Sequence, residues 1–251
     1  MRIGTRGSAL ALAQARLVAD ALGGGEVVVI ETAGDRDRAH RFDQIGDGRG
    51  VFTREIERAL LDGRVDAAVH SAKDLTGESP EGLVIGAIPE RGDPRDACCG
   101  PFRSLEELPA GCRVGTSSAR RAGLLGELRP DVQVVPLRGN VDTRLRKLDD
   151  GEADAIVLAA AGLQRLGWES RIAFRLDPAV FVPEAGQGAL AVQVRAGEEG
   201  RVAAIDHAPS RRAVEAERAR VAELSGGCTV PVAAHAWYEG GRLRLRSWAA
   251  T

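Results

Sequence analysis

Short runs of β-branched residues alternate with amphipathic stretches along most of this chain, and this alternation limits its fold more than any other feature. The pattern is typical of βαβ units, which build a mainly parallel sheet. The first series predicts strands at 1–5 and 25–33, a helix from a Ser8 cap to Leu22, a helix over 52–63 that ends at Gly63, and a strand over 64–74. Residues 33–50 have little apolar content and are expected to form a long mobile loop.

A second series of the same kind begins near residue 95. The segments CRVGTSSARRAGLL (112–125), QVVPLRGNVDTRLRKLDDG (133–151) and DAIVLAAAGLQRLG (154–167) each predict a strand, a turn and a helix, with Asn140 as a cap. Pro- and Gly-bearing stretches at 89–96 and 176–194 predict paired crossings between two lobes. A last helix over 211–224 and two short strands predict a small third unit.

Composition narrows the class of protein. A hydrophobic fraction of 44% and a charged fraction of 28% are ordinary for a globular chain. No window approaches 18 uninterrupted apolar residues, and the start lacks the apolar core of a signal peptide. A net charge of −2 and an aromatic content of 4% disfavour a nucleic-acid binder. We therefore expect a soluble cytoplasmic protein with no nucleic-acid or membrane partner.

The cysteines and histidines do not suggest a metal site. Adjacent Cys98 and Cys99 do not fit a CxxC spacing, and the four histidines are far apart in the sequence. Cys228 differs from the other cysteines because it lies in the segment Gly226-Gly227-Cys228-Thr229, straight after a predicted helix. The glycines leave room for covalent attachment at the sulfur, while a buried small apolar role is an equally good interpretation.

The junctions between predicted strands and helices carry cations and hydroxyls. In open α/β sheets, ligands bind where strands end and helices begin. Helix N-terminal amides favour anions there, and the guanidinium fork matches a carboxylate or phosphate. The residues concerned are Arg6, Ser8, Thr116, Ser117, Ser118, Arg120, Arg121, Arg138, Asn140 and Arg144. Each junction alone could be a plain cap beside solvated arginines, but together they predict an anion-binding cleft. The absence of a GxxxxGK[ST] loop favours carboxylates as the anion.

The segment HSAKD (70–74) ends an apolar strand with Lys73 beside Asp74. Lysine is an unusual choice in this chain, which has only one other, Lys147. An Asp at a cleft can exchange protons with a substrate amine or stabilise a developing cation. The alternative is a surface ion pair that closes the strand.

Eight ordered motifs link the chain to a family. They are TRGSALALAQA, HSAKDL, DPRDA, GTSSARR, LRGNVDTRL, DAIVLAAAGLQRLG, PEAGQGALAV and GGCTVPVAAHA. By these motifs, residues 2 to about 245 resemble the porphobilinogen deaminase (hydroxymethylbilane synthase) family. The resemblance implies an α/β fold with two periplasmic-binding-protein-like lobes of mixed sheets, plus a small, shortened α+β third domain. The implied domains are 1–90 with 188–206, then 91–187, then 207–251.

The resemblance also implies a transferase. It would condense four porphobilinogen molecules stepwise to hydroxymethylbilane, releasing ammonia, in the synthesis of haem and related tetrapyrroles. A dipyrromethane cofactor would be thioether-linked to Cys228, and the protein would act as a monomer. Asp74 would be the catalytic carboxylate, stabilising the cationic intermediates, with Lys73 as a cation beside it. The residues that would hold the carboxylates of cofactor and substrate are Arg6, Ser8, Arg49, Thr116, Ser117, Ser118, Arg120, Arg121, Arg138, Arg144, Arg165 and Gln187.

The chain departs from the family pattern in three places. Gln44 and Arg49 stand where the family has lysines, and Thr76 stands where it usually has Pro. The third domain is also several tens of residues shorter than usual. Two other functions stay open: a non-catalytic, two-lobed carboxylate-binding protein, and a thiol enzyme that pairs Cys228 with a base such as His235.

Overall fold

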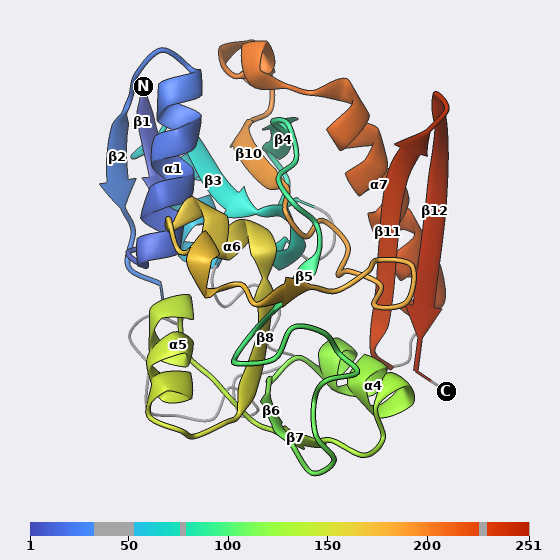
Figure 1. The fold of residues 1–251 in the computed structure, drawn as a ribbon. Helices are drawn as coiled ribbons and strands as arrows, with labels where there is room; N and C mark the ends of the chain where they lie inside the picture. Colours follow the sequence, from blue (N-terminus) through green and yellow to red (C-terminus); the bar gives the residue numbers. More distant parts are fainter. Residues whose placement is uncertain (33–52, 76–78, 226–229, 251) are drawn as a thin grey trace. The chain divides into compact units, whose positions relative to one another are not determined.

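The computed structural model of this chain describes residues 1–32, 53–75, 79–225 and 230–250. These residues form two compact units (Figure 1). Unit 1 comprises Met1–Arg91 and Ala189–Arg212, and unit 2 comprises Gly92–Gly188 and Ala213–Thr251. None of the helices in the described ranges is both long and apolar enough to span a membrane.

Unit 1 contains a five-stranded mixed sheet in the order β2-β1-β3-β10-β4. Strand β1 pairs in parallel with β2 and β3, and β10 runs antiparallel to β3 and β4. The strands are β1 (Arg2–Thr5), β2 (Glu26–Val29), β3 (Ala67–Ser71), β4 (Leu83–Ala87) and β10 (Leu190–Arg195). The 3-10 helices of this unit are η2 (Ala72–Asp74), η4 (Glu199–Arg201) and η5 (Ala203–Ile205).

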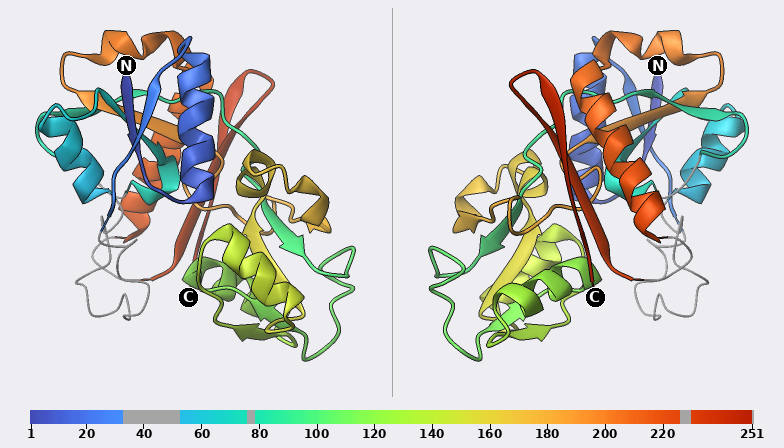
Figure 2. Two further views of the ribbon diagram at one scale, coloured as in Figure 1. Left: turned by 90° about the vertical axis from the view of Figure 1, so that its left-hand side faces the viewer. Right: turned by 90° about the vertical axis from the view of Figure 1, so that its right-hand side faces the viewer.

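Helices α1 (Ala9–Ala21) and α3 (Arg54–Leu61) cover opposite faces of this sheet (Figure 2). The alternation of side chains along β3 explains the arrangement. Ala67 and Val69 pack in the hydrophobic cluster that contains Val18 of α1. Ala68 points the other way, into the cluster that contains Leu60 of α3.

Unit 2 repeats this topology with a second five-stranded sheet, in the order β7-β6-β8-β5-β9. Strand β6 is parallel to β7 and β8, and β5 is antiparallel to β8 and β9. The strands are β5 (Asp96–Cys99), β6 (Arg113–Gly115), β7 (Gln133–Val135), β8 (Ala155–Ala159) and β9 (Phe174–Arg175). The helices are α4 (Ala119–Leu128), α5 (Val141–Asp149), α6 (Ala160–Arg165) and the 3-10 helix η3 (Glu169–Arg171).

The antiparallel strand of each sheet directly follows one of the two Pro- and Gly-bearing stretches. Strand β5 begins after residues 88–95, and β10 begins after residues 176–189. The predicted α/β fold with two mixed sheets and a small C-terminal sheet is therefore confirmed.

The C-terminal part consists of helix α7 (Ala208–Ser225) and a hairpin of β11 (Val232–Glu239) and β12 (Arg242–Ala249). Trp248 of β12 packs on α4 so closely that a Cβ at Gly123 would lie 2.6 Å from its ring. The Trp248 indole Nε1 also donates to the Glu127 carboxylate at 2.9 Å. These contacts hold the hairpin against α4, within unit 2.

Candidate functional site

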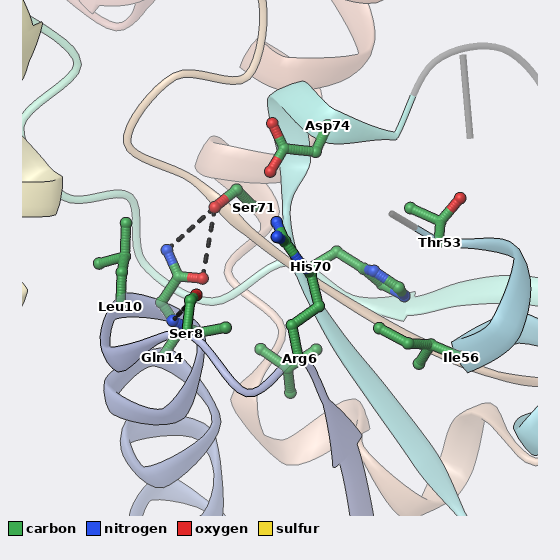
Figure 3. Close-up of a pocket in the computed structure, with 11 residues that line it drawn as sticks. Arg6, Ser8, Leu10, Gln14, Thr53, Ile56, His70, Ser71 and Asp74 are labelled. Carbon is green, nitrogen blue, oxygen red and sulfur yellow. Dashed lines mark hydrogen bonds between the residues drawn. The ribbon is translucent and has the colours of Figure 1, made fainter. Parts of the chain in front are cut away.

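A pocket of about 420 Å³, open to solvent, lies in unit 1 where β1 and β3 end and α1 begins (Figure 3). Its position at the carboxyl ends of parallel strands is where α/β sheets bind ligands. The residues that line it are Arg6, Ser8, Leu10, Ala11, Gln14, Thr53, Ile56, Val69, His70, Ser71 and Asp74. Three of these residues, Arg6, Ser8 and Asp74, were predicted from the sequence.

The local sequence places these three side chains. Strand β1 ends at Thr5, and Ser8 then caps α1 by accepting a hydrogen bond from the Ala11 N–H at 3.3 Å. Strand β3 ends at Ser71, and the single turn of η2 carries Asp74 to the pocket. Figure 3 shows the Arg6 side chain extending from the end of β1 toward Ser71 and Asp74. Lys73 lies in the same turn but is not among the lining residues.

Gln14 and Ser71 form a hydrogen-bonded pair across the pocket. Neither residue was predicted from the sequence. The Gln14 Nε2 donates to the Ser71 Oγ at 2.9 Å, and the Ser71 hydroxyl lies 3.3 Å from the Gln14 Oε1 (Figure 3). Gln14 belongs to the buried face of α1, together with Ala15 and Val18. The position of Gln14, a polar residue on the apolar face of a predicted helix, could have indicated that it is a site residue.

His70 is another lining residue that was not predicted from the sequence. Its side chain is buried on β3, and no hydrogen-bond partner reaches its Nε2 within the described structure. Burial lowers the pKa of His70 to about 4, and the nearby Gln193 side chain opposes this only in part. The imidazole is therefore neutral at pH 7.

A second polar group lies in unit 2, where the first turn of α4 meets β5. The Arg121 Nε donates to the Asp96 Oδ1 at 2.8 Å, and the Arg120 Nη2 lies 2.8 Å from the Asp96 Oδ2. All three side chains are at least 95% buried. Arg121 also contacts the Gln187 Oε1 at 3.4 Å. The structure thus brings Arg120, Arg121 and Gln187 together, around an Asp96 that the sequence did not indicate.

Arg144 and Arg165 add two cations, and each donates to a backbone carbonyl within the described residues. The Arg144 Nε donates to the Gly139 oxygen at 2.7 Å, and an Arg165 Nη donates to the Gly188 oxygen at 2.6 Å. Burial lowers the pKa of both guanidinium groups to about 10, and for Arg144 the neighbouring Arg121 contributes. Within the described ranges neither has a carboxylate partner.

The hydroxyl groups at the β6–α4 junction differ in how accessible they are to a ligand. The Thr116 side chain is buried, and its Oγ1 accepts from the Ser118 N–H at 3.2 Å. The Ser118 Oγ caps α4 by accepting from the Arg121 N–H at 3.4 Å, whereas Ser117 is exposed. Asn140 is the N-cap residue of α5, as predicted, although its side chain makes no capping hydrogen bond. Arg138 is exposed. Cys228, Arg49, Gln44 and Thr76 lie outside the described residues.

Comparison with known families identifies the chain. Residues 1–203 match the model of the porphobilinogen deaminase dipyrromethane cofactor binding domain. The chain belongs to the porphobilinogen deaminase family. Residues 211–250 match the C-terminal domain model of the same family. The resemblance seen in the sequence motifs is thereby confirmed, and with it the expectation of a transferase of tetrapyrrole synthesis.

Named porphobilinogen deaminases from two bacteria are among the similar proteins. The one from Syntrophus aciditrophicus (strain SB) is 47% identical over 256 residues, which cover 98% of this chain and 83% of that protein. The one from Roseiflexus sp. (strain RS-1) is 50% identical over 254 residues, covering 97% and 84%. Among solved structures, immunogenic lipoprotein A from Vibrio vulnificus aligns with a TM-score of 0.49 and 14% identity, over 86% of this chain and 99% of that one.

The residues of unit 2 suit the multiply carboxylated cofactor for which this family's domain model is named. Among the described residues, Arg120 and Arg121 share the carboxylate of Asp96, and Arg144 is near enough to Arg121 that the two positive charges repel, so positive charge is in excess. The buried Nε of Arg120 also has no hydrogen-bond acceptor among the described residues. Because an unbalanced buried cation is costly, this cluster favours a ligand that brings carboxylates.

Proposed function

We propose that this chain catalyses the porphobilinogen deaminase reaction, the stepwise condensation of four porphobilinogen molecules to hydroxymethylbilane with release of ammonia. The observation that carries the proposal is the convergence of Arg6 and Asp74 in one pocket at the carboxyl ends of β1 and β3. A cation for the substrate carboxylates and an anion for the reacting amine thus occupy one site. A non-catalytic carboxylate-binding protein would account for Arg6, but it would have no use for Asp74.

Asp74 is the catalytic carboxylate in this proposal. It is exposed to the pocket, where it can reach a substrate amine without a change of fold. A carboxylate there stabilises the positive charge that develops as ammonia leaves, and it can transfer the proton involved. Lys73, in the same turn, supplies a cation beside it.

Arg6 and Ser8 hold the substrate at the start of α1. The guanidinium of Arg6 matches the planar acetate or propionate group of porphobilinogen. The first amides of the 13-residue helix α1 favour the same negative charge. The Gln14–Ser71 pair forms the wall of this pocket and limits how the ring can lie.

The cations of unit 2 hold further carboxylates, from the cofactor and from the growing chain. Arg144 and Arg165 are the best candidates to bind these carboxylates, since among the described residues they donate to backbone carbonyls and not to a carboxylate. Arg120 and Arg121 are already paired with Asp96, so we propose that they attract the ligand carboxylates mainly by their positive charge. The other proposed contributors are Arg49, Thr116, Ser117, Ser118, Arg138 and Gln187.

The dipyrromethane cofactor, thioether-linked to Cys228, would supply the pyrrole carbon at which the first substrate is added. We further propose that the chain acts as a cytoplasmic monomer with no nucleic-acid or membrane partner. Its proposed domains are 1–90 with 188–206, then 91–187, then 207–251. The two family matches, which meet between residues 203 and 211, support the last boundary.

The intact mass of the purified protein, together with turnover of porphobilinogen, tests the function. We expect an excess over the polypeptide mass equal to two linked pyrrole units, a colour with Ehrlich reagent, and formation of hydroxymethylbilane. A bare polypeptide that binds porphobilinogen without turnover would instead support the carboxylate-binding alternative.

A further inference from the structure

Asp96 is a fully buried carboxylate on β5, and each of its oxygens lies beside an arginine from the first turn of α4. The Oδ1 accepts a hydrogen bond from the Arg121 Nε at 2.8 Å, and the Arg121 Nη2 lies 2.8 Å from the same oxygen. The Oδ2 lies 2.8 Å from the Arg120 Nη2. One carboxylate thus joins the sheet of unit 2 to two adjacent arginines of α4.

Each nitrogen of the Arg121 guanidinium has an acceptor within unit 2. Besides the contact with Asp96, the Nη1 donates to the Val157 carbonyl of β8 at 3.0 Å, and the Nη2 donates to the Gln187 Oε1 at 3.4 Å. Gln187 is fixed in turn, because its Nε2 donates to the Pro94 carbonyl at 2.8 Å. The Arg121 side chain is therefore held from three directions and cannot turn toward a ligand while these bonds remain.

Arg120 has fewer aligned contacts. Its Nη1 donates to the Val182 carbonyl at 2.8 Å, and its guanidinium carbon lies 5.9 Å from the centre of the Phe181 ring. Its contact with Asp96 is not aligned as a hydrogen bond, and its Nε has no acceptor among the described residues. The position of this guanidinium therefore depends on its attraction to the Asp96 carboxylate.

The positive charges around Asp96 would repel one another without it. Arg120 and Arg121 lie in the first turn of the 10-residue helix α4, where the positive end of the helix dipole disfavours cations. Burial lowers the pKa of Arg144 to about 10, and repulsion from Arg121 lowers it further. Because charges interact strongly in the protein interior, the buried carboxylate determines where these guanidinium groups lie.

We propose that Asp96 is a positioning residue for carboxylate binding in unit 2: it holds Arg120 and Arg121 against their mutual repulsion, so that their charge acts on a ligand carboxylate bound by Arg144. The inference rests on the proposed function, in which Arg144 binds such a carboxylate. Asp96 does not touch the ligand in this role. It acts through the two arginines, whose combined charge it only partly neutralises.

The test compares Asp96→Asn with Leu108→Ala, a buried apolar change in unit 2 at a residue outside this cluster. Cofactor-free forms of both variants and of the wild type are incubated with increasing concentrations of porphobilinogen, well below each unfolding midpoint. Intact mass then gives the rate at which the cofactor mass appears. We expect the porphobilinogen concentration at half-maximal rate to rise about tenfold or more in Asp96→Asn and to stay at the wild-type value in Leu108→Ala.

Three results would overturn the proposal. An unchanged concentration in Asp96→Asn would show that the arginines need no positioning. A lower concentration would show that only the total positive charge matters, since this variant removes a negative charge. An equal rise in Leu108→Ala would show that any loss of stability has the same effect.

Arg121→Lys separates position from charge, and it decides the matter alone if Asp96→Asn does not fold. Lysine keeps the positive charge but lacks the planar fork that contacts Asp96, Val157 and Gln187 together. We expect the half-maximal concentration to rise about tenfold in this variant also, and a wild-type value would contradict the proposal. A wild-type protein that never gains the cofactor mass refutes the proposed function itself, which distinguishes the two failures.

Discussion

The Nε of Arg121 donates to the Oδ1 of Asp96 across 2.8 Å, and both side chains are almost completely buried. The same carboxylate lies 2.8 Å from Arg120, though that contact is not aligned as a hydrogen bond. Two guanidinium groups therefore share one negative charge. This imbalance makes the cluster suited to a carboxylated ligand, and it makes Asp96 important for stability.

Asp96→Asn should destabilise the protein by about 3–5 kcal/mol, because it leaves two buried cations without a counter-charge. Urea unfolding measures this directly. Asp154→Asn is the matched control, since Asp154 pairs with Arg113 at 2.7 Å while both side chains are about 40% exposed. The control should cost about 1 kcal/mol or less. Equal losses in the two variants would contradict the buried-pair interpretation.

Arg144→Met should make the protein more stable but weaken its binding of porphobilinogen. Removing a cation whose pKa is lowered by burial and by Arg121 should raise the free energy of unfolding, by about 1 kcal/mol. If Arg144 binds a ligand carboxylate as proposed, the same change removes a charged hydrogen bond worth about 1.5–3 kcal/mol, so the KM for porphobilinogen should rise about tenfold or more. Thermal unfolding and steady-state kinetics check the two effects. A variant that is less stable and binds normally would assign Arg144 a structural role.

His70 should make the protein less stable in mild acid. Its pKa of about 4 in the folded state is below the ordinary value of 6.5, so the unfolded chain takes up a proton first as pH falls. The stability it contributes is complete above pH 6.5 and is lost between pH 6.5 and pH 4. At pH 5 the loss should be about 2 kcal/mol.

Unfolding in urea at pH 7 and pH 5 measures this loss for the wild type and for His70→Gln. The variant has no titrating group at this position, so its stability should fall by about 2 kcal/mol less over the same interval. An identical pH dependence in the two proteins would show that His70 is not the responsible group.

Asp74→Ala should retain the cofactor mass and lose turnover by a factor of about 100 to 10,000, the usual share of a catalytic acid or base. Asp62→Ala provides the control, because Asp62 is an exposed residue of unit 1 that does not line the pocket. It should leave both mass and turnover unchanged. Substantial activity in Asp74→Ala would remove that carboxylate from catalysis.

Cys228→Ser should prevent thioether formation, so the purified variant should have the bare polypeptide mass. In the wild type, the loaded thiol should resist iodoacetamide. A thiol enzyme would show the opposite behaviour, because its active form would be alkylated at Cys228 with loss of activity. A normal loaded mass in the serine variant would place the attachment elsewhere.

The sequence alone predicted the features that depend on residues close together in the chain. Ser8 caps α1 as expected, because the bond to the Ala11 N–H forms within one helical turn. The alternation of strand and helix patterns predicted the junctions that carry Arg6 and Asp74, since each pattern is read within a few residues. Its prediction of a mainly parallel sheet was wrong, because β10 and β5 pair antiparallel with both of their neighbours. The ordered motifs indicated the correct family.

Only the tertiary structure decided which distant residues meet. Gln14 and Ser71 are 57 positions apart, and nothing in their spacing indicates that β3 ends beside α1. In the same way, Asp96 is 25 positions from the guanidinium that it binds, and Glu217 is 31 positions from Gly186. Local pattern determines which elements form, but the packing of their apolar faces determines which polar groups are buried together and must therefore pair.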